Sequence, residues 1–172
     1  MRRHGPYQID AGYRQFYIQD LDQPGDTSSD AFWTTEALEH RLAFVPYVIG
    51  IATDTNGEVP VTVEVREDEP SFKPGDWDHI AEVSLELTGN RLKLAGCPDG
   101  DVRFHTISAS PGWHRVRVHS AGLTQCPPEV HYSGDHYLVQ IWPAPAGPRT
   151  LLKQYEGSLV DTKRDVENGH RW

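Results

Sequence analysis

The stretch Val59-Pro-Val-Thr-Val-Glu-Val65 decides the fold, because apolar and polar side chains alternate along it. A second run with the same period is Ala81-Glu-Val-Ser-Leu-Glu-Leu87. Strict alternation is typical of an antiparallel β-strand that has one face in the core and the other in solvent. We therefore predict strands in both runs, with the valines and leucines buried and with Glu64, Glu82 and Glu86 facing outward.

Six further segments carry weaker forms of the same pattern, at 13–19, 47–52, 91–94, 102–107, 113–119 and 136–142. Turn sequences such as Thr88-Gly-Asn90 separate them. About eight short strands with turns between them predict an antiparallel β-sandwich, with a closed barrel as the alternative. Gly50 indicates a bulge or a close backbone contact. The side chains that we expect to form the core are Val61, Val63, Val83, Leu85, Val116, Val118, Val139 and Ile141.

One segment lacks the alternation and predicts the main helix, over residues 33–44. Thr34 or Thr35 is suited to the N-cap, where a hydroxyl accepts a hydrogen bond from a free backbone N–H. Leu38 and Leu42 are one helical turn apart and share a face. Pro46 is expected to end the helix, because proline has no N–H to donate.

The length of 172 residues suits a single domain. We assign that domain to residues 1–152. Residues 153–172 are mostly polar and predict a flexible or weakly docked tail. We expect no secretory signal, because no apolar run follows the first basic residues, and no apolar run is long enough to span a membrane. It has two cysteines, Cys97 and Cys126, which we expect to be free thiols in a cytoplasmic protein.

The charge balance and the missing motifs exclude several classes of function. Sixteen basic and 25 acidic side chains give a net charge of 16 − 25 = −9. Such a chain is unsuited to unaided binding of nucleic acid or of an anionic membrane. No zinc-protease, phosphate-loop or nucleophile-elbow motif is present. The acid and base in Ser133-Gly-Asp-His136 are more typical of a turn than of a catalytic triad. We expect no enzyme activity, no metal and no cofactor.

Carboxylates are the main group of candidate functional side chains, and they cluster in two predicted loops. They have two interpretations: a solvated face that keeps the protein soluble, or an acidic surface that docks onto a basic protein. In the second interpretation the binding residues are Asp20, Asp22 and Asp26 in the first loop, and Glu67, Asp68, Glu69, Asp76 and Asp78 in the second.

Aromatic and arginine side chains mark the outward faces of the late strands. Trp113, Arg115, Arg117 and His119 share one face by alternation. This composition is common at protein interfaces, but another element of the same chain could equally cover it. An exposed Trp113 or Trp142 could instead stack on a small flat ligand, such as a carbohydrate. The sequence therefore leaves open an interaction module and a small-ligand-binding β-sandwich.

Several stretches together resemble a known family. They include Tyr13-Arg-Gln-Phe-Tyr17, Phe32-Trp-Thr-Thr-Glu-Ala37, Trp77-Asp-His-Ile-Ala81, Pro111-Gly-Trp-His-Arg115 and Gly134-Asp-His-Tyr-Leu138. Their order is similar to that of the competence protein J (ComJ) family, over about residues 7–145. That family is known for inhibiting a competence-associated DNA nuclease. The resemblance implies a non-catalytic, immunity-type protein with a nuclease as its protein partner, and it carries over no inhibitory residues. An acidic protein suits a partner whose DNA-binding cleft is basic.

Overall fold

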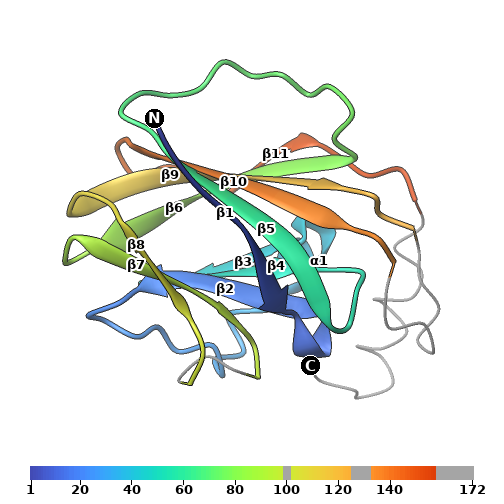
Figure 1. Cartoon of the computed structure of the whole chain (residues 1–172), viewed down its shortest axis with the longest axis horizontal. Helices are drawn as coiled ribbons and strands as arrows, with labels where there is room; N and C mark the ends of the chain where they lie inside the picture. The colour runs from blue at the N-terminus through green and yellow to red at the C-terminus, as the bar shows by residue number, and fades with distance from the viewer. Residues whose placement is uncertain (99–101, 125–132, 158–172) are drawn as a thin grey trace.

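The computed structural model describes residues 1–98, 102–124 and 133–157. Within these residues the chain forms strands, one short 3-10 helix and one α-helix. The strands belong to two sheets, which pack against each other face to face (Figure 1). The expectation of a mostly β chain is therefore confirmed.

The first sheet has six strands, and its spatial order is β1-β5-β10-β9-β6-β11. All of its pairs are antiparallel except that between β5 and β10, which is parallel. The sheet is thus mixed, where alternation alone predicted an antiparallel one. Its strands are β1 (Arg2–Asp10), β5 (Glu58–Val65), β6 (His79–Leu87), β9 (Gly112–Ala121), β10 (His136–Pro143) and β11 (Thr150–Lys153).

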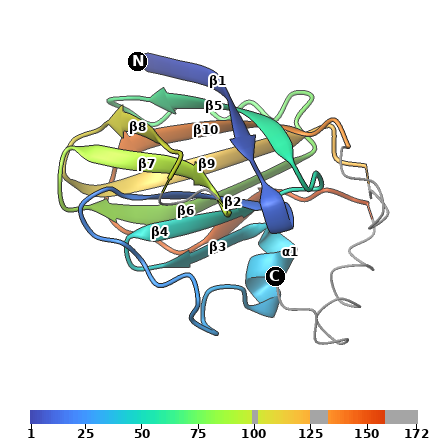
Figure 2. The same cartoon turned by 60° about the horizontal axis from the view of Figure 1, so that its bottom comes forward.

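The second sheet has five strands in the order β3-β4-β2-β7-β8, and every pair in it is antiparallel. The helix α1 (Thr35–His40) lies beside β3 and β4 at one edge of this sheet (Figure 2). The strands are β2 (Gln15–Asp20), β3 (Leu42–Val45), β4 (Val48–Ala52), β7 (Arg91–Gly96) and β8 (His105–Ser108), and the 3-10 helix η1 (Gly12–Arg14) precedes β2.

The core between the sheets contains the side chains that the alternation placed there. All eight of the predicted core residues are buried, and Phe16, Ile18, Leu92 and Leu94 from the second sheet pack with them. A register error of one residue would have exchanged the two faces of each strand. The predicted register is therefore confirmed.

The outer face of the six-stranded sheet differs from the prediction. Glu64 and Glu82 point away from the core, as predicted, but their exposed fractions are only 6% and 8%. Glu64 accepts hydrogen bonds from Arg3 and Gln140, at 3.2 and 2.9 Å. Glu82 is paired with arginines of β9, described below. Both carboxylates are covered by other side chains, and cationic or amide donors to each offset the cost of burying it.

The helix is shorter than the predicted 33–44. Thr34 is its N-cap, and its hydroxyl accepts a hydrogen bond from the backbone N–H of Ala37 at 3.1 Å. Arg41 ends the helix in a left-handed conformation, five residues before Pro46. Leu42 then begins β3, where it is buried in the core between the sheets. The spacing of Leu38 and Leu42 suits a helix, but pairing with β4 places residues 42–45 in a strand.

Strands β1, β3 and β11 were not predicted, and all three lie at sheet edges. Lys153 ends β11, and the backbone of Tyr155 donates a hydrogen bond to His79. The start of the predicted tail therefore lies on the six-stranded sheet. The rest of it, residues 158–172, is outside the described residues, as is Cys126.

None of the helices in the described ranges is long and apolar enough to cross a membrane.

Candidate functional site

The predicted acidic residues lie on opposite sides of the molecule. Glu67, Asp68, Glu69, Asp76 and Asp78 belong to the β5–β6 loop (residues 66–78), which arches over the outer face of the six-stranded sheet (Figure 1). Asp20 ends β2, and Asp22 and Asp26 belong to the β2–α1 loop (residues 21–34), which lies below the five-stranded sheet. The two groups form two separate surfaces.

Arg117 anchors the β5–β6 loop to the sheet. Its side chain is only 3% exposed, and its Nε donates to Glu82 Oε1 at 2.5 Å. Its two terminal nitrogens donate to the Pro70 carbonyl and to Glu69 Oε1, both at 3.1 Å. One arginine thus joins a buried carboxylate of β6 to two successive residues of the loop. Such charge-assisted hydrogen bonds are stronger than neutral ones.

Two aromatic rings hold the guanidinium of Arg117 in place. The rings of Phe72 and Trp142 have their centroids 5.6 and 5.1 Å from its central carbon. These distances are typical of cation–π contacts. Trp142 is buried, whereas 46% of Phe72 remains exposed. The loop is therefore fixed from beneath, while one face of an aromatic ring is presented to solvent.

The β5–β6 loop presents a net negative charge around Phe72. Arg66 and Lys73 oppose five carboxylates, which gives 2 − 5 = −3. Glu67, Asp68 and Asp76 are exposed, and Glu69 is exposed although it pairs with Arg117. Asp78 is half-buried, and its Oδ2 accepts a hydrogen bond from the Leu123 N–H at 3.0 Å. The loop thus combines an exposed aromatic side chain with surrounding carboxylates on a fixed backbone.

Asp20 does not belong to any exposed acidic surface, contrary to what we expected. It is 1% exposed, and its carboxylate accepts hydrogen bonds from the N–H and hydroxyl of Thr88 and from the Asp22 N–H. Burial tends to raise the pKa of Asp20, but these hydrogen bonds to the charged form outweigh it and lower that pKa. Asp20 is a structural residue that ties the end of β2 to the turn after β6.

The other two acidic residues of the first group are exposed. Asp22 lies 3.7 Å from Arg91, and each of these side chains is about half exposed, so the pair is weak. Asp26 accepts hydrogen bonds from the N–H and hydroxyl of Ser28, which shape the local turn. Of the large hydrophobic residues of this loop, Phe32 is buried, and Leu21 and Trp33 are half-buried. This surface therefore has carboxylates without an exposed aromatic side chain.

The outward face of β9 is covered by other elements of the same chain. This is the second of the two interpretations that the sequence left open for this face, the first being a protein interface. Arg115 donates to Glu82 at 3.1 Å and to the carbonyls of Gly147 and Pro148 before β11. His119 lies beside Trp77 of the β5–β6 loop, with ring centroids 5.3 Å apart. Elements of the same chain therefore cover this face. Trp113 remains 45% exposed.

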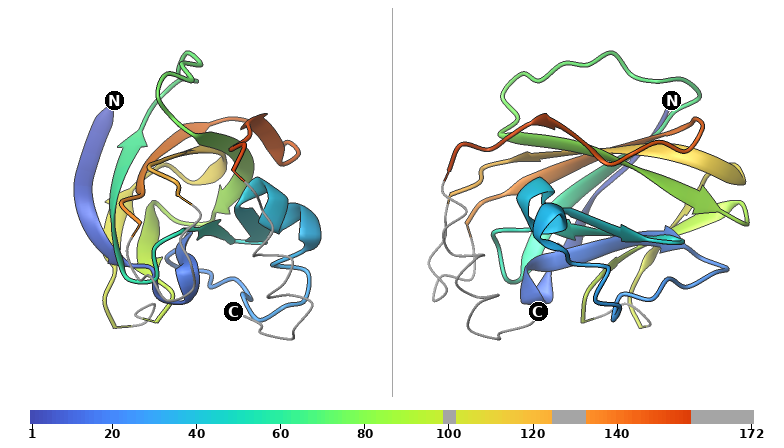
Figure 3. Two further views of the ribbon diagram at one scale, coloured as in Figure 1. Left: turned by 90° about the vertical axis from the view of Figure 1, so that its right-hand side faces the viewer. Right: turned by 180° about the vertical axis from the view of Figure 1, so that it is seen from behind.

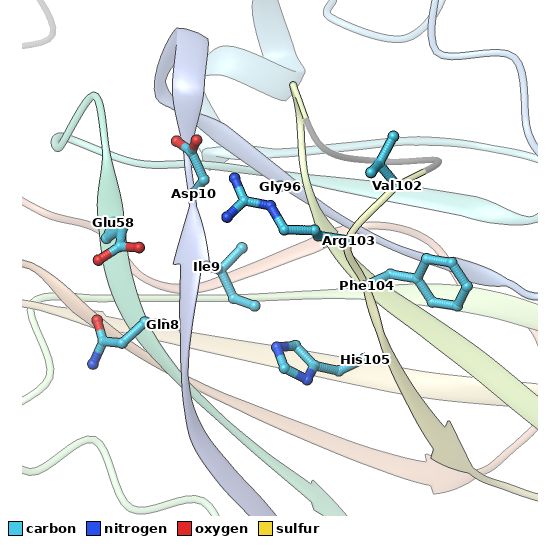
Figure 4. A pocket seen from close by; sticks show the side chains of 9 residues that line it. All are labelled: Gln8, Ile9, Asp10, Glu58, Gly96, Val102, Arg103, Phe104 and His105. Carbon is cyan, nitrogen blue, oxygen red and sulfur yellow. The ribbon is translucent and has the colours of Figure 1, made fainter.

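Two surface hollows formed by described residues bear on the expectation of a tryptophan-lined ligand site. One surface hollow lies between β1 and the segment that leads into β8, and Figure 4 shows the side chains that line it. They are Gln8, Ile9, Asp10, Glu58, Gly96, Val102, Arg103, Phe104 and His105. A second hollow is lined by Asp78 and residues 153–157. Tryptophan lines neither hollow, and Trp142 is covered by Arg117.

A buried polar network lies around Asp135, in the turn that the sequence singled out. Its carboxylate accepts hydrogen bonds from the hydroxyls of Thr55, Ser133 and Tyr137 and from the Asp54 N–H. Burial tends to raise the pKa of Asp135, but the hydrogen bonds keep it below its usual value. The network ties the β4–β5 loop to β10, so its role is structural. In the described ranges no three metal-ligating side chains gather at one point.

Arg117 as the anchor of the β5–β6 loop is the part of the site that the sequence did not predict. The sequence did contain a sign of this contact, because an arginine that shares an outward strand face with aromatic residues needs an acceptor for its hydrogen bonds. The identity of that partner depends on a loop about 50 residues away in the chain, which alternation does not place.

Comparison with known proteins identifies the fold and nothing finer. No family model matches the chain, and no curated protein is significantly similar to it in sequence. Among solved structures it is similar to ComJ from Bacillus subtilis, described as an inhibitor of the DNA-degrading activity of NucA. The TM-score is 0.64 at 14% identity, and the alignment covers 83% of this chain and 98% of that one. The product of crocagin biosynthetic gene J is also similar, with a TM-score of 0.54 at 17% identity, over 84% and 100% of the two chains. The chain has a ComJ-like fold.

Proposed function

We propose that this protein is a non-catalytic inhibitor that binds a DNA-degrading nuclease through the β5–β6 loop. The observation that carries the proposal is the fold: nearly the whole of ComJ, described as an inhibitor of NucA, aligns with this chain. The expectation of a nuclease partner, drawn from the sequence, agrees with this similarity in three dimensions.

The surface chemistry supports the choice of the β5–β6 loop. A nuclease that grips DNA presents cationic side chains to phosphates, and an acidic surface is complementary to them. The β5–β6 loop adds to its carboxylates the exposed ring of Phe72, and aromatic side chains commonly dominate binding energy at the centre of an interface. Because Arg117 fixes the loop in advance, little conformational entropy is lost when a partner binds.

The loop contributes to this binding in two ways. Glu67, Asp68 and Asp76 attract the partner at a distance, which raises the association rate. Phe72 contacts the partner after docking, which lowers the dissociation rate. The β2–α1 loop lies on the other side of the molecule, so its carboxylates are outside the proposed contact.

The direct test is inhibition of nuclease activity by the purified protein. A secreted or competence-associated nuclease encoded beside this gene is mixed with increasing amounts of the protein, and the degradation of plasmid DNA is followed. We expect stoichiometric loss of cleavage, and an unchanged electrophoretic mobility of the DNA with the protein alone. Full cleavage at a large molar excess of the protein contradicts the proposal.

The variant Phe72→Ala tests the assigned surface in the same assay. We expect weaker inhibition, by about tenfold or more in concentration, because truncation of a hot-spot side chain costs about 2 kcal/mol of binding energy or more and we assign that role to Phe72. The control is Trp113→Ala, which removes a side chain of similar exposure outside the loop and is expected to inhibit as the unmodified protein does.

A further inference from the structure

His79 lies where three segments of the chain meet. It begins β6 and is 3% exposed. Its Nε2 is 2.8 Å from the carbonyl oxygen of His40, at the end of α1. Its Nδ1 is 3.2 Å from the backbone nitrogen of Tyr155, after β11. One imidazole thus bridges the helix, the sheet and the C-terminal segment.

The two hydrogen bonds define the protonation state of His79. The His40 carbonyl only accepts, so Nε2 must carry a proton and donate it. The Tyr155 N–H only donates, so Nδ1 must be unprotonated and accept. The ring is therefore neutral in this arrangement. A proton on Nδ1 would place two N–H donors face to face.

The groups around His79 give a charged ring little support. On the helix side stand His40 and Arg41, and the guanidinium of Arg41 pairs with Asp54. Burial is the main cause that lowers the pKa of His79, and the charges of Arg41 and His40 add to it. The hydrogen bond to the His40 carbonyl acts in the opposite direction, and the resulting pKa is about 4. From the other elements, Asp78 precedes His79 in the chain, and His119 and Lys153 both pair with Ile80 next to it. Tyr155, which donates its backbone N–H to His79, and Glu156 belong to the C-terminal segment.

Among the described residues, few other hydrogen bonds hold the segment that His79 contacts. Residues 154–157 follow β11, which runs along the edge of the six-stranded sheet near α1 (Figure 3, right). Lys153 Nζ donates to the Gly75 carbonyl at 3.4 Å, a long hydrogen bond at an exposed position. The Tyr155 N–H to His79 is a bond to a buried partner. The segment also forms most of the wall of the hollow beside Asp78.

We propose that His79 is an acid-sensitive latch for the C-terminal segment. Protonation of Nδ1 breaks the hydrogen bond from Tyr155 and releases residues 154–157 from the sheet, while the core between the sheets stays folded. Release removes most of the wall of the hollow beside Asp78 and exposes the edge of the sheet there. The latch is a property of the chain by itself, and it does not depend on the proposed nuclease partner.

The test is an NMR titration of the full chain from about pH 7 to about pH 4. The ring carbons of His79 report its protonation, the Tyr155 amide reports the latch, and the Val83 amide reports the core. We expect His79 and Tyr155 to share one midpoint well below 6.5, the ordinary pKa of histidine, while Val83 keeps its folded shift. Over the same range, protection of the Tyr155 amide from hydrogen exchange, corrected for the intrinsic rate at each pH, should fall by about tenfold or more.

Two variants separate the latch from a general effect of acid. In His79→Gln the side-chain amide can donate to the His40 carbonyl and accept from Tyr155, but it does not titrate, so protection of Tyr155 should persist to acid pH. In the control His119→Gln, a second buried histidine that contacts the Leu138 carbonyl is replaced, and Tyr155 should titrate as in the unmodified protein.

Three results would overturn the proposal. They are a His79 midpoint at or above 6.5, a Tyr155 amide whose protection does not follow His79, and a His79→Gln chain that still loses Tyr155 protection in acid. If His79→Gln does not fold, the titration of the unmodified chain decides alone, because the shared midpoint is required in either case.

Discussion

Arg117 shows at the scale of one residue how the outer face of the sheet is organised. A guanidinium presents several donors in a fixed plane, so one side chain can reach Glu82, Glu69 and the Pro70 carbonyl at once. Lysine has a compact ammonium group and could not stack between Phe72 and Trp142 in the same way. The burial of Glu82, which alternation alone placed in solvent, follows from this arginine and from Arg115.

Replacing Arg117 by methionine should destabilise the protein markedly. The change leaves Glu82 buried with only one of its two arginines and removes the anchor of the β5–β6 loop. Loss of one partner of a buried ion pair costs about 3–5 kcal/mol, and we expect about 3 here because Arg115 remains. Urea unfolding measures the change.

The matched control for that variant is Arg91→Met. Arg91 pairs with Asp22 at 3.7 Å, and both side chains are about half exposed. Exposed ion pairs contribute about 0–1 kcal/mol, so this variant should unfold nearly as the unmodified protein does. Equal losses in the two variants would show that Arg117 is not the anchor described above.

At the scale of elements, the outer face of the five-stranded sheet depends on Gly50 of β4. A Cβ built on Gly50 would lie 2.7 Å from Phe32 Cζ and 3.0 Å from Trp33 Cζ2. Phe32 is buried there with Ala37, Ala43 and Val48 in a second, smaller core. The absence of a side chain at Gly50 lets the β2–α1 loop pack directly on the strand, which agrees with the second of the two alternatives that the sequence left open, a bulge or a close contact.

Gly50→Ala should therefore destabilise the protein by about 1–3 kcal/mol, the usual cost of overpacking a core. Gly147→Ala is the control, because its Cβ would meet nothing closer than Arg115 at 3.6 Å, an ordinary contact distance. Thermal unfolding of both variants distinguishes them. A Gly50→Ala chain with an unchanged melting temperature would mean that the loop can move away from β4 without cost.

The elements that the sequence predicted are those with a strong local pattern. All eight predicted strands are present, although their ends are shifted. The alternation of apolar and polar residues identifies a strand without knowing which other strands pair with it. Edge strands are different, because β3 and β11 are four residues long and β1 is mostly exposed and contains Pro6. Their strand form comes from pairing with distant segments. The acidic loops were predicted, but their separation onto opposite sides depends on which strands join which sheet.

At the scale of the whole molecule, stability should fall in weakly acidic solution. His79 and His119 are buried, and burial is the main cause that lowers the pKa of each from 6.5 to about 4. The unfolded chain therefore takes up protons at a higher pH than the folded chain does. The neutral histidines therefore make their full contribution to the free energy of unfolding above about pH 6.5, and this contribution is lost as the pH falls toward about 4.

Between about pH 7 and 4.5 the expected loss is about 2.5 kcal/mol for each histidine, because each unit of pKa shift corresponds to about 1.4 kcal/mol and the last half unit lies below this range. Urea unfolding at about pH 7, 5.5 and 4.5 measures it, and the range lies above the lowered pKa values of Asp20 and Asp135. The variant His119→Gln should flatten the dependence by about half. Stability that is constant over this range would contradict the neutral state of both rings.

The net charge of −9 acts over the whole surface, but the two acidic loops face different directions. Carboxylates on every side of the molecule therefore contribute to the long-range attraction of a basic partner, whereas only those of one loop touch it. Salt screens charges beyond about 8–10 Å, so only carboxylates near the contact should matter at physiological salt. This difference allows the docking surface to be located by experiment.

The association rate with the nuclease, at low and at physiological salt, tests the central claim most directly. The test variant carries Glu67→Gln, Asp68→Asn and Asp76→Asn in the β5–β6 loop. The control carries Asp22→Asn, Asp26→Asn and Asp30→Asn in the β2–α1 loop and loses the same charge. We predict that the test variant associates about tenfold more slowly at low salt, that the control is slowed less there and hardly at all at physiological salt, and that dissociation is little affected in both. Association that is independent of salt, or slowed equally in both variants, would contradict docking through the β5–β6 loop.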